Sequence, residues 1–188
     1  HVRAGHRGID GQAPQGALPA QVPHAECIAG RHWQWDGVHF VYVWPMDRHS
    51  GDDNDRSCVL LVHGGGRSLL LTGDISAAAE TQLLTHYGEL LRSEVVLVPH
   101  HGSAGSSSEA FIAAVKPQVA LISSGFQNRF RHPRPEVLER YRNAGAQTVN
   151  TVDSGWAELT GTPDGWVWSR QARHDDRRYW LRNAQEAS

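Results

Sequence analysis

The chain has 188 residues, 39% of them hydrophobic, with 18 Lys and Arg against 20 Asp and Glu. This length accommodates one domain with its own core, and the formal net charge of −2 excludes a global basic field for nucleic acid, so any such contact is local. The apolar runs fall far short of the roughly 20 residues that cross a bilayer, so we expect no membrane span.

The first half of the chain predicts a loop followed by two hairpins. Residues 1–30 are rich in Gly, Ala, Pro and Gln without periodicity, which indicates a linker or the degenerate start of a domain. Two alternating runs around Asp36-Gly37, a dipeptide that favours two-residue turns, predict a hairpin over 32–44. After a polar loop, "SCVLLVHGGGRSLLLTGD" predicts a second hairpin. Because the chain opens on "HVRAGHRG", without Met or a signal-type apolar segment, we expect a domain cut from a longer protein.

The second half predicts alternating helices and strands. "ISAAAETQLLTHYGELLR" has helical spacing, with Ser76 placed to cap it, and "EVVLV" is typical of a strand covered on both faces. The remaining predicted elements are a helix near 107–115, a strand in "QVALIS", a helix near 134–143, and strands in "AQTVNTV", "WAELTG" and "GWVWSR". We expect an α/β layered domain with a mixed sheet over 31–170 and a charged tail over 171–188.

The two cysteines, Cys27 and Cys58, have no CxxC spacing. A disulfide would require an oxidising compartment, and two buried free thiols are the favoured interpretation.

Polar residues cluster where three predicted strands end. Asp74 closes "SLLLTGD", His100 and His101 follow "EVVLV", and "SSGFQNRFRHP" follows "QVALI". Ligands of α/β sheets bind outside the carboxyl ends of strands, so we expect these segments to converge. A carboxylate with imidazoles suits Zn²⁺ or Mn²⁺.

The ordered motifs "NDRSCVLLV", "LLLTGDI", "VVLVPHHGSAGSSS" and "ALISSGFQNRFRHPRPEVLERYRNAG" resemble the metallo-β-lactamase-like domain that ends bacterial competence proteins of the ComEC/Rec2 family. The match runs from about Cys27 to Gly155. The resemblance implies an αββα layered sandwich that lacks its N-terminal part here. It also implies a hydrolase site in which two zinc or manganese ions activate water against a phosphodiester.

The resemblance assigns roles to individual residues. Asp74 would bridge the two ions, His100 would bind the second ion, and His101 would join Asp74 in the catalytic site. The substrate pocket would be lined by Asn54, Ser57, Ser103, Asn128, Arg129 and His132. From the residues alone, Arg129, Arg131 and Arg134 form either a solvated charged face or phosphate contacts.

The departure from the family lies in its first metal motif, HxHxDH or HxDxDH, of which this chain has no intact copy. In "HVRAGHRG", His1 and His6 match the ends of the frame and are the tentative further ligands. Arg3 and Gly5 replace expected ligands, and neither can bind a cation. Either this segment is a degenerate relic, or the motif lies upstream of His1.

The implied function is that of a metal-dependent nuclease acting on imported DNA, single-stranded or duplex, during natural transformation. The domain would lie on the periplasmic side of the inner membrane, beside the membrane channel of its parent protein. The alternatives are a degenerate non-catalytic module of the DNA-uptake channel and a small-molecule phosphoesterase of the same fold. If the N-terminal half of the sandwich is absent, apolar faces of the 32–44 hairpin and of "EVVLV" should be exposed.

Overall fold

The structure is a computed structural model that describes residues 2–4, 26–46, 52–162 and 164–175. Its centre is a seven-stranded sheet with the spatial order β2-β3-β4-β5-β6-β7-β8. The strands are β2 (His32–Trp35), β3 (Val38–Trp44), β4 (Val59–Gly64), β5 (Arg67–Leu71), β6 (Val95–Leu97), β7 (Val119–Ile122) and β8 (Gln147–Asn150).

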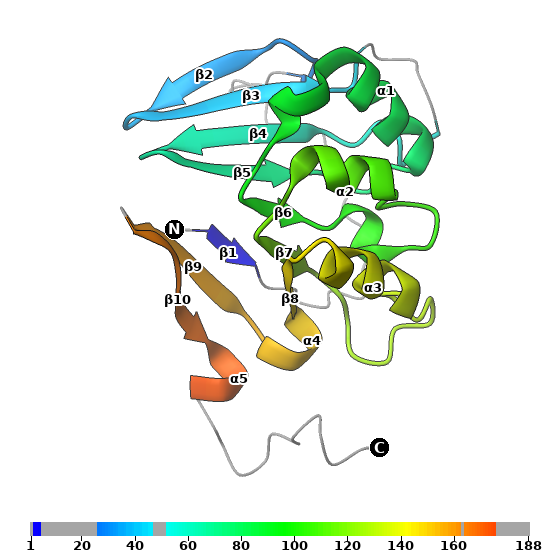
Figure 1. Cartoon of the computed structure of the whole chain (residues 1–188), viewed down its shortest axis with the longest axis vertical. Coiled ribbons are helices and arrows are strands. Elements are labelled where there is room, and N and C mark those ends of the chain that lie inside the picture. The colour runs from blue at the N-terminus through cyan, green and yellow to red at the C-terminus, as the bar shows by residue number, and fades with distance from the viewer. Residues whose placement is uncertain (1, 5–25, 47–51, 163, 176–188) are drawn as a thin grey trace, which may run out of the picture.

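A second sheet of three strands has the order β1-β9-β10, formed by β1 (Val2–Ala4), β9 (Ala157–Thr162) and β10 (Gly165–Gln171). It lies against one face of the large sheet, and the main helices cover the other face (Figure 1). The helical segments are α1 (Ala77–Tyr87), η1 (Gly88–Leu91), η2 (Pro99–Gly102), α2 (Glu109–Val115), α3 (Pro135–Asn143), α4 (Thr151–Ser154) and α5 (Ala172–Asp175). The predicted α/β layered fold with a mixed sheet is confirmed.

The pairing type changes once across the large sheet, from antiparallel to parallel. Strands β2 to β5 pair antiparallel, as the two predicted hairpins require, and β5 to β8 pair parallel. Asp36 and Gly37 both have positive φ, which is the conformation expected for the predicted two-residue turn. Because parallel strands end on one edge, the loops after β5, β6 and β7 meet there.

Two apolar clusters hold the layers together. Alternate residues of one strand point to opposite faces, so Val96 packs under the helices while Val95 packs toward the small sheet. The first cluster unites the large sheet with α1, α2 and α3 through Leu83, Phe111 and Tyr141. The second unites it with the small sheet through Leu159, Trp166 and Trp168, among others.

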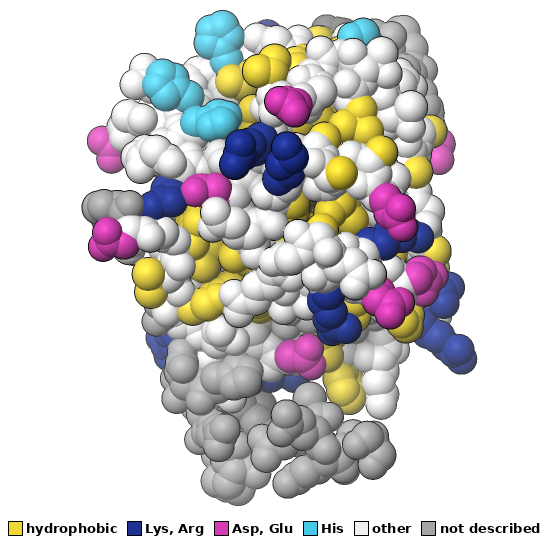
Figure 2. All heavy atoms as spheres, in the orientation of Figure 1, with side chains coloured by type: hydrophobic (Ala, Val, Ile, Leu, Met, Phe, Trp, Pro, Cys, Tyr) yellow, Lys and Arg dark blue, Asp and Glu magenta, His cyan; other side chains and the backbone are white. Residues whose placement is uncertain are grey.

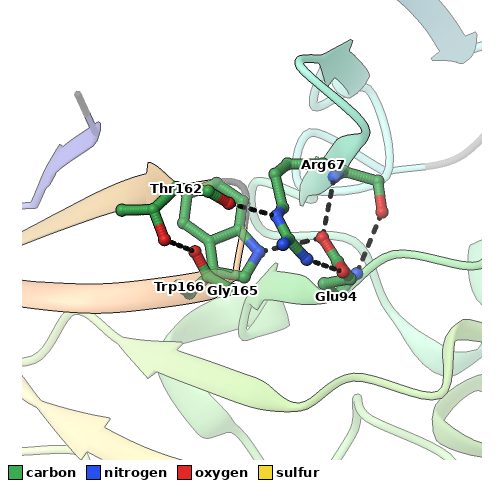
Figure 3. Close-up of polar contacts among 6 residues, drawn as sticks. Arg67, Glu94, Thr162, Gly165 and Trp166 are labelled. Carbon is green, nitrogen blue, oxygen red and sulfur yellow. Dashed lines mark hydrogen bonds and ion pairs between the residues drawn. The ribbon is translucent and has the colours of Figure 1, made fainter.

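A polar network joins the two sheets at one edge of the second cluster (Figure 3). The carboxylate of Glu94 accepts hydrogen bonds from Arg67 Nη1 at 2.8 Å, Trp166 Nε1 at 3.0 Å and Ser68 N–H at 3.3 Å. Arg67 Nε also donates to the Thr162 carbonyl at 3.0 Å. Burial alone would raise the pKa of Glu94, but the hydrogen bonds from Trp166, Arg67 and Ser68 outweigh it and lower the pKa.

Several expectations differ from the structure. Strand β1, paired antiparallel with β9, lies within the 1–30 segment that was predicted as a linker or degenerate start. The predicted strand "AQTVNTV" ends at Asn150, whose side chain caps the single turn of α4 by accepting from Val152 N–H. The predicted tail begins with the end of β10 and the turn of α5.

The free-thiol interpretation is wrong, because Cys27 and Cys58 form a disulfide across 31 positions of sequence. The chain before β2 folds back along the end of β3, where the N–H groups of Ala29 and Gly30 donate to the carbonyls of Pro45 and Tyr42. That return brings Cys27 beside the start of β4, with a Cα–Cα distance of 5.7 Å to Cys58. Sequence spacing contains no signal for this fold-back.

The expectation of exposed apolar faces is confirmed for the first hairpin only. Trp35 is 75% exposed and Trp33, stacked on Phe40 with ring centroids 4.9 Å apart, is 40% exposed. The second apolar cluster contains no residue of β2 or β3, and in Figure 1 these strands extend past the small sheet. For "EVVLV" the expectation is wrong, because Val95, Val96 and Val98 are buried by the small sheet and the helices.

Candidate functional site

Four side chains meet at the carboxyl ends of β5, β6 and β7, and we call them the strand-end cluster: Asp74, His100, His101 and His132. Asp74 follows β5, the two adjacent histidines lie in η2 after β6, and His132 lies in the loop after β7. The His100 N–H donates to the Gly73 carbonyl at 3.0 Å, which ties the second segment to the first. Nε2 of His101 lies 3.5 Å from Oδ1 of Asp74.

One hydrogen bond fixes the orientation of His101. Its Nδ1 lies 2.7 Å from the Ser123 carbonyl oxygen, which only accepts, so Nδ1 carries the proton. If the ring is neutral, Nε2 presents a lone pair to Asp74; if it is protonated, Nε2 carries the N–H that faces the carboxylate. Such a pair suits a shared proton or a shared cation, and an imidazole held by a carbonyl in this way is common among metal ligands.

Both histidines of η2 have unusual backbone conformations. His100 has φ 48° and His101 has φ 55°, in the left-handed region of backbone conformation that residues other than glycine rarely adopt. Such conformations persist only where the surroundings enforce them, and they gather at functional sites. The adjacent Gly102 has φ 82°, and a Cβ there would lie 2.6 Å from Pro133 Cβ.

A buried polar network holds the loop that follows η2. Glu80 of α1 accepts from Ser107 N–H and, at 2.8 Å, from Ser108 N–H. Arg140 Nη1 donates to the Ser107 carbonyl at 3.0 Å, and the Tyr141 hydroxyl lies 3.2 Å from Ser107 Oγ. Burial raises the pKa of Glu80, against the opposing effect of the two N–H groups and Arg140. Ser108 also caps α2 by accepting from Phe111 N–H at 3.3 Å.

The loop after β7 brings His132 to the cluster. Asn128 holds this loop closed, because its Nδ2 donates to the carbonyls of Gly125 and His132 while its Oδ1 accepts from His132 N–H. The ring centroid of His132 lies 5.8 Å from that of His100. Burial lowers the pKa of His132, and His100, Arg134 and His101 lower it further, while Asp74 acts in the opposite direction.

Of the other residues that the resemblance assigns to the substrate pocket, Ser57 and Ser103 accept hydrogen bonds from backbone N–H groups, and Asn54 lies away from the cluster. Ser57 Oγ accepts from Asp74 N–H at 3.0 Å, so it positions the carboxylate. Ser103 Oγ accepts from Gly105 N–H at 3.4 Å. Asn54 is exposed in a turn where its N–H donates to Asp52, and no contact among the described residues joins its side chain to Asp74. His1 and His6, the tentative further ligands, lie outside the described residues.

An exposed aromatic pair beside the cluster was not predicted. Phe126 is 62% exposed and Phe130 is 55% exposed, both in the loop that Asn128 closes. Arg129 Cζ lies 4.6 Å from the Phe130 ring centroid, and that ring lies 5.7 Å from His132, with 23° between the planes. The alternation of aromatic and basic residues in "FQNRFR" is the signal that could have revealed them.

Other histidines gather elsewhere. Figure 2 shows histidine side chains over the end of the molecule formed by β2, β3 and β4. His39 and His63 face each other there across β3 and β4, and both are exposed. Burial, and then His39, lower the pKa of His63. No described contact links this group to the strand-end cluster.

The strand-end cluster fits one part of a metal centre. Nε2 of His101 lies 3.5 Å from Oδ1 of Asp74, and the rings of His100 and His132 lie beside them, so the cluster holds side chains of the types that zinc and manganese accept. Within the described part of the chain, however, no three His, Cys, Asp or Glu side chains are arranged to hold one ion. The described residues therefore do not complete the two-ion site that the resemblance implies.

Comparison with known proteins finds several relatives in sequence. The chain is 42% identical over 149 residues to "Competence protein ComA" of Neisseria gonorrhoeae, covering 77% of this chain and 22% of that protein. It is 41% identical over 129 residues to "Recombination protein 2" of Haemophilus influenzae, covering 69% of this chain and 16% of that protein. A solved structure from Thermotoga maritima, assigned to the metallo-β-lactamase superfamily, is 14% identical with a TM-score of 0.41, covering 72% of this chain and 65% of that one. No protein-family model matches.

The fold is a layered α/β domain with a mixed sheet, and the strand-end cluster lies where its parallel strands end. The chain is homologous over 77% of its length to ComA and over 69% to Recombination protein 2, and it spans about a fifth of the length of these curated relatives. None of the helices in the described residues is both long and apolar enough to cross a bilayer.

Proposed function

We propose that this chain is a DNA-handling domain that acts in DNA uptake during natural transformation, and that the strand-end cluster is its phosphodiester site. The observation that supports this most directly is the pairing of Asp74 with an oriented His101, in a chain closely similar to competence proteins. Side chains of both residues are nearly half exposed, which suits a long polymer better than a small enclosed ligand.

The finer proposal is that the site hydrolyses the phosphodiester. His101 Nε2 is the free base of the cluster, because Nδ1 is committed to the Ser123 carbonyl, and it can take a proton from an attacking water. A zinc or manganese pair, completed by ligands from outside the described residues, would supply a water of lowered pKa and offset the phosphate charge. Asp74 and His100 would bind those ions.

The disulfide supports an oxidising location. Disulfides persist outside the cytoplasm, so Cys27–Cys58 supports a domain on the periplasmic side of the inner membrane. In this proposal the membrane channel of the parent protein is the partner that delivers the DNA.

A second candidate is a non-catalytic module that binds DNA without cleaving it. The observation that favours it is the lack of a three-ligand group among the described side chains. In that case the cluster would hold a phosphate by protonated imidazoles alone.

The test combines binding and cleavage of labelled DNA by the chain and by its parent protein, with Mn²⁺ or Zn²⁺. The proposal expects binding by both, cleavage by the parent, and loss of cleavage in Asp74→Ala and His101→Ala but not in His86→Ala on α1. Binding without cleavage under every condition would support the non-catalytic module. Hydrolysis of a small phosphodiester with no DNA binding would support the phosphoesterase, and no binding or hydrolysis would reject all three.

A further inference from the structure

We infer that Phe126 and Phe130 form a base-stacking platform that makes the strand-end cluster selective for single-stranded DNA. This inference rests on the proposed DNA-binding function and adds to it the strandedness of the substrate. The platform is the loop from Gly125 to Pro133, which we call the aromatic loop.

The rings of Phe126 and Phe130 are both exposed to solvent. Large apolar side chains usually pack, yet Phe126 and Phe130 expose more than half of their surface. Phe126 makes no aromatic or cation–π contact with any described residue, whereas Phe130 is contacted by Arg129 and His132. Exposure of both rings in one loop indicates a contact surface.

The aromatic loop lies next to the strand-end cluster. Phe130 lies beside His132, which lies beside His100 in the strand-end cluster. A base stacked on the aromatic loop would therefore lie close to a phosphate held at the strand-end cluster.

Three arginines lie around the aromatic loop. Arg129, Arg131 and Arg134 lie in or next to the loop, and none of them pairs with a carboxylate among the described residues. A stacking surface flanked by cations that no described carboxylate pairs is the combination that binds single strands, because every base has a π-face and every linkage has a phosphate. Bases inside a duplex are already stacked and cannot use it.

Hydrogen bonds hold the aromatic loop in one conformation. Asn128 closes the loop with three hydrogen bonds, and Gly102 packs against Pro133, where Arg134 N–H donates to the Gly102 carbonyl at 2.9 Å. The rings are therefore presented on a fixed frame, and less ordering is required when a strand binds.

The experiment measures fluorescence anisotropy of a labelled oligothymidine, its duplex with oligoadenine, and an abasic strand of the same length. The wild-type chain should prefer the oligothymidine over both other probes. Phe130→Ala should weaken oligothymidine binding about tenfold and the Phe126→Ala, Phe130→Ala double variant further, since stacking one base contributes about that much. Duplex and abasic affinities should stay unchanged, and Phe130→Trp should retain binding.

Two controls separate stacking from other causes. Trp35→Ala removes an even more exposed aromatic side chain from the far hairpin and should leave every affinity unchanged. Phe130→Ala alters no charge, so the salt dependence of binding should keep its slope, whereas Arg131→Ala should reduce it.

The outcomes separate this inference from the proposed function. Wild-type binding of DNA that Phe130→Ala and the double variant leave intact would overturn the stacking platform while the DNA-binding function stands. Equal losses for oligothymidine and the abasic strand would also overturn it. A wild-type chain that binds no DNA would overturn both proposals.

Discussion

At the residue scale, the geometry of the strand-end cluster depends on glycines that admit no side chain. Gly102 combines a positive φ with a contact to Pro133 that a Cβ would occupy, so Gly102→Ala strains the backbone and separates η2 from the aromatic loop. We expect a loss of about 1–2 kcal/mol from the conformation alone, and more from the contact. Urea unfolding of the variant and the wild type measures this loss in the free energy of unfolding.

Gly105→Ala is the matched control for that change. Gly105 lies three residues on, and a Cβ there would meet only Ser103 Oγ at 3.9 Å. Its stability should change little. A Gly102→Ala variant as stable as Gly105→Ala would contradict the close packing of η2 against the aromatic loop.

The residues of the cluster could be predicted, but their contacts could not. Asp74, His100 and His101 follow strands, and strand ends of a parallel sheet converge, which is readable from sequence. The hydrogen bond from His101 to the Ser123 carbonyl depends on backbone geometry between two loops and leaves no sequence pattern. The resemblance placed both His100 and His101 with Asp74, and the structure adds that Nε2 of His101 lies 3.5 Å from Oδ1 of Asp74.

At the element scale, α1 holds the loop after η2 through one buried carboxylate. Both oxygens of Glu80 accept backbone N–H groups, so Glu80→Gln would turn an amide NH₂ toward one of those donors. We expect a loss of about 1–3 kcal/mol, the typical cost of an unsatisfied buried donor. The same change at the exposed Glu109 of α2 serves as the control in thermal unfolding, and equal melting temperatures would contradict this role.

Hairpins and capped helices were predicted well because their signals are local. Asp36-Gly37 specifies its turn, and Ser76 caps α1 by accepting from Ala78 N–H, as expected. Strand β1 was missed because a three-residue strand is too short for a periodic pattern and forms only by pairing with β9.

At the scale of the whole molecule, the Glu94 network links the two sheets and gives stability a pH dependence. A lowered pKa means that the ionised carboxylate stabilises the fold. This contribution is complete above the unfolded-state pKa of about 4.3 and is lost as pH falls through the lower folded-state pKa. In the Glu94→Gln variant, the free energy of unfolding should therefore fall less steeply than in wild type as the solution is acidified.

This fall with acidification is measured by urea unfolding at a series of pH values. Glu89→Gln removes an exposed carboxylate of η1 and is the control. If Glu94→Gln reproduces the wild-type slope below about pH 4.3, the network does not couple the sheets in the way its hydrogen bonds indicate.

The disulfide acts on the whole molecule by closing a loop that contains the first hairpin. For a separation of 31 residues, loss of the cross-link should destabilise the chain by about 3–4 kcal/mol through the entropy of the unfolded state. The Cys27→Ser, Cys58→Ser variant should unfold at lower urea concentration than wild type, and reduction should produce the same shift in wild type. An unchanged midpoint would contradict the cross-link.

The central claim is that DNA binds at the strand-end cluster and the aromatic loop, and not at the other exposed aromatic surface, the β2–β3 hairpin. Chemical-shift changes of histidine rings and tryptophan indoles during titration with oligothymidine test it directly. The account predicts shifts for His100, His101 and His132, with the indole signals of Trp33 and Trp35 unchanged. Shifts of those two indoles with the three histidines unperturbed would contradict it.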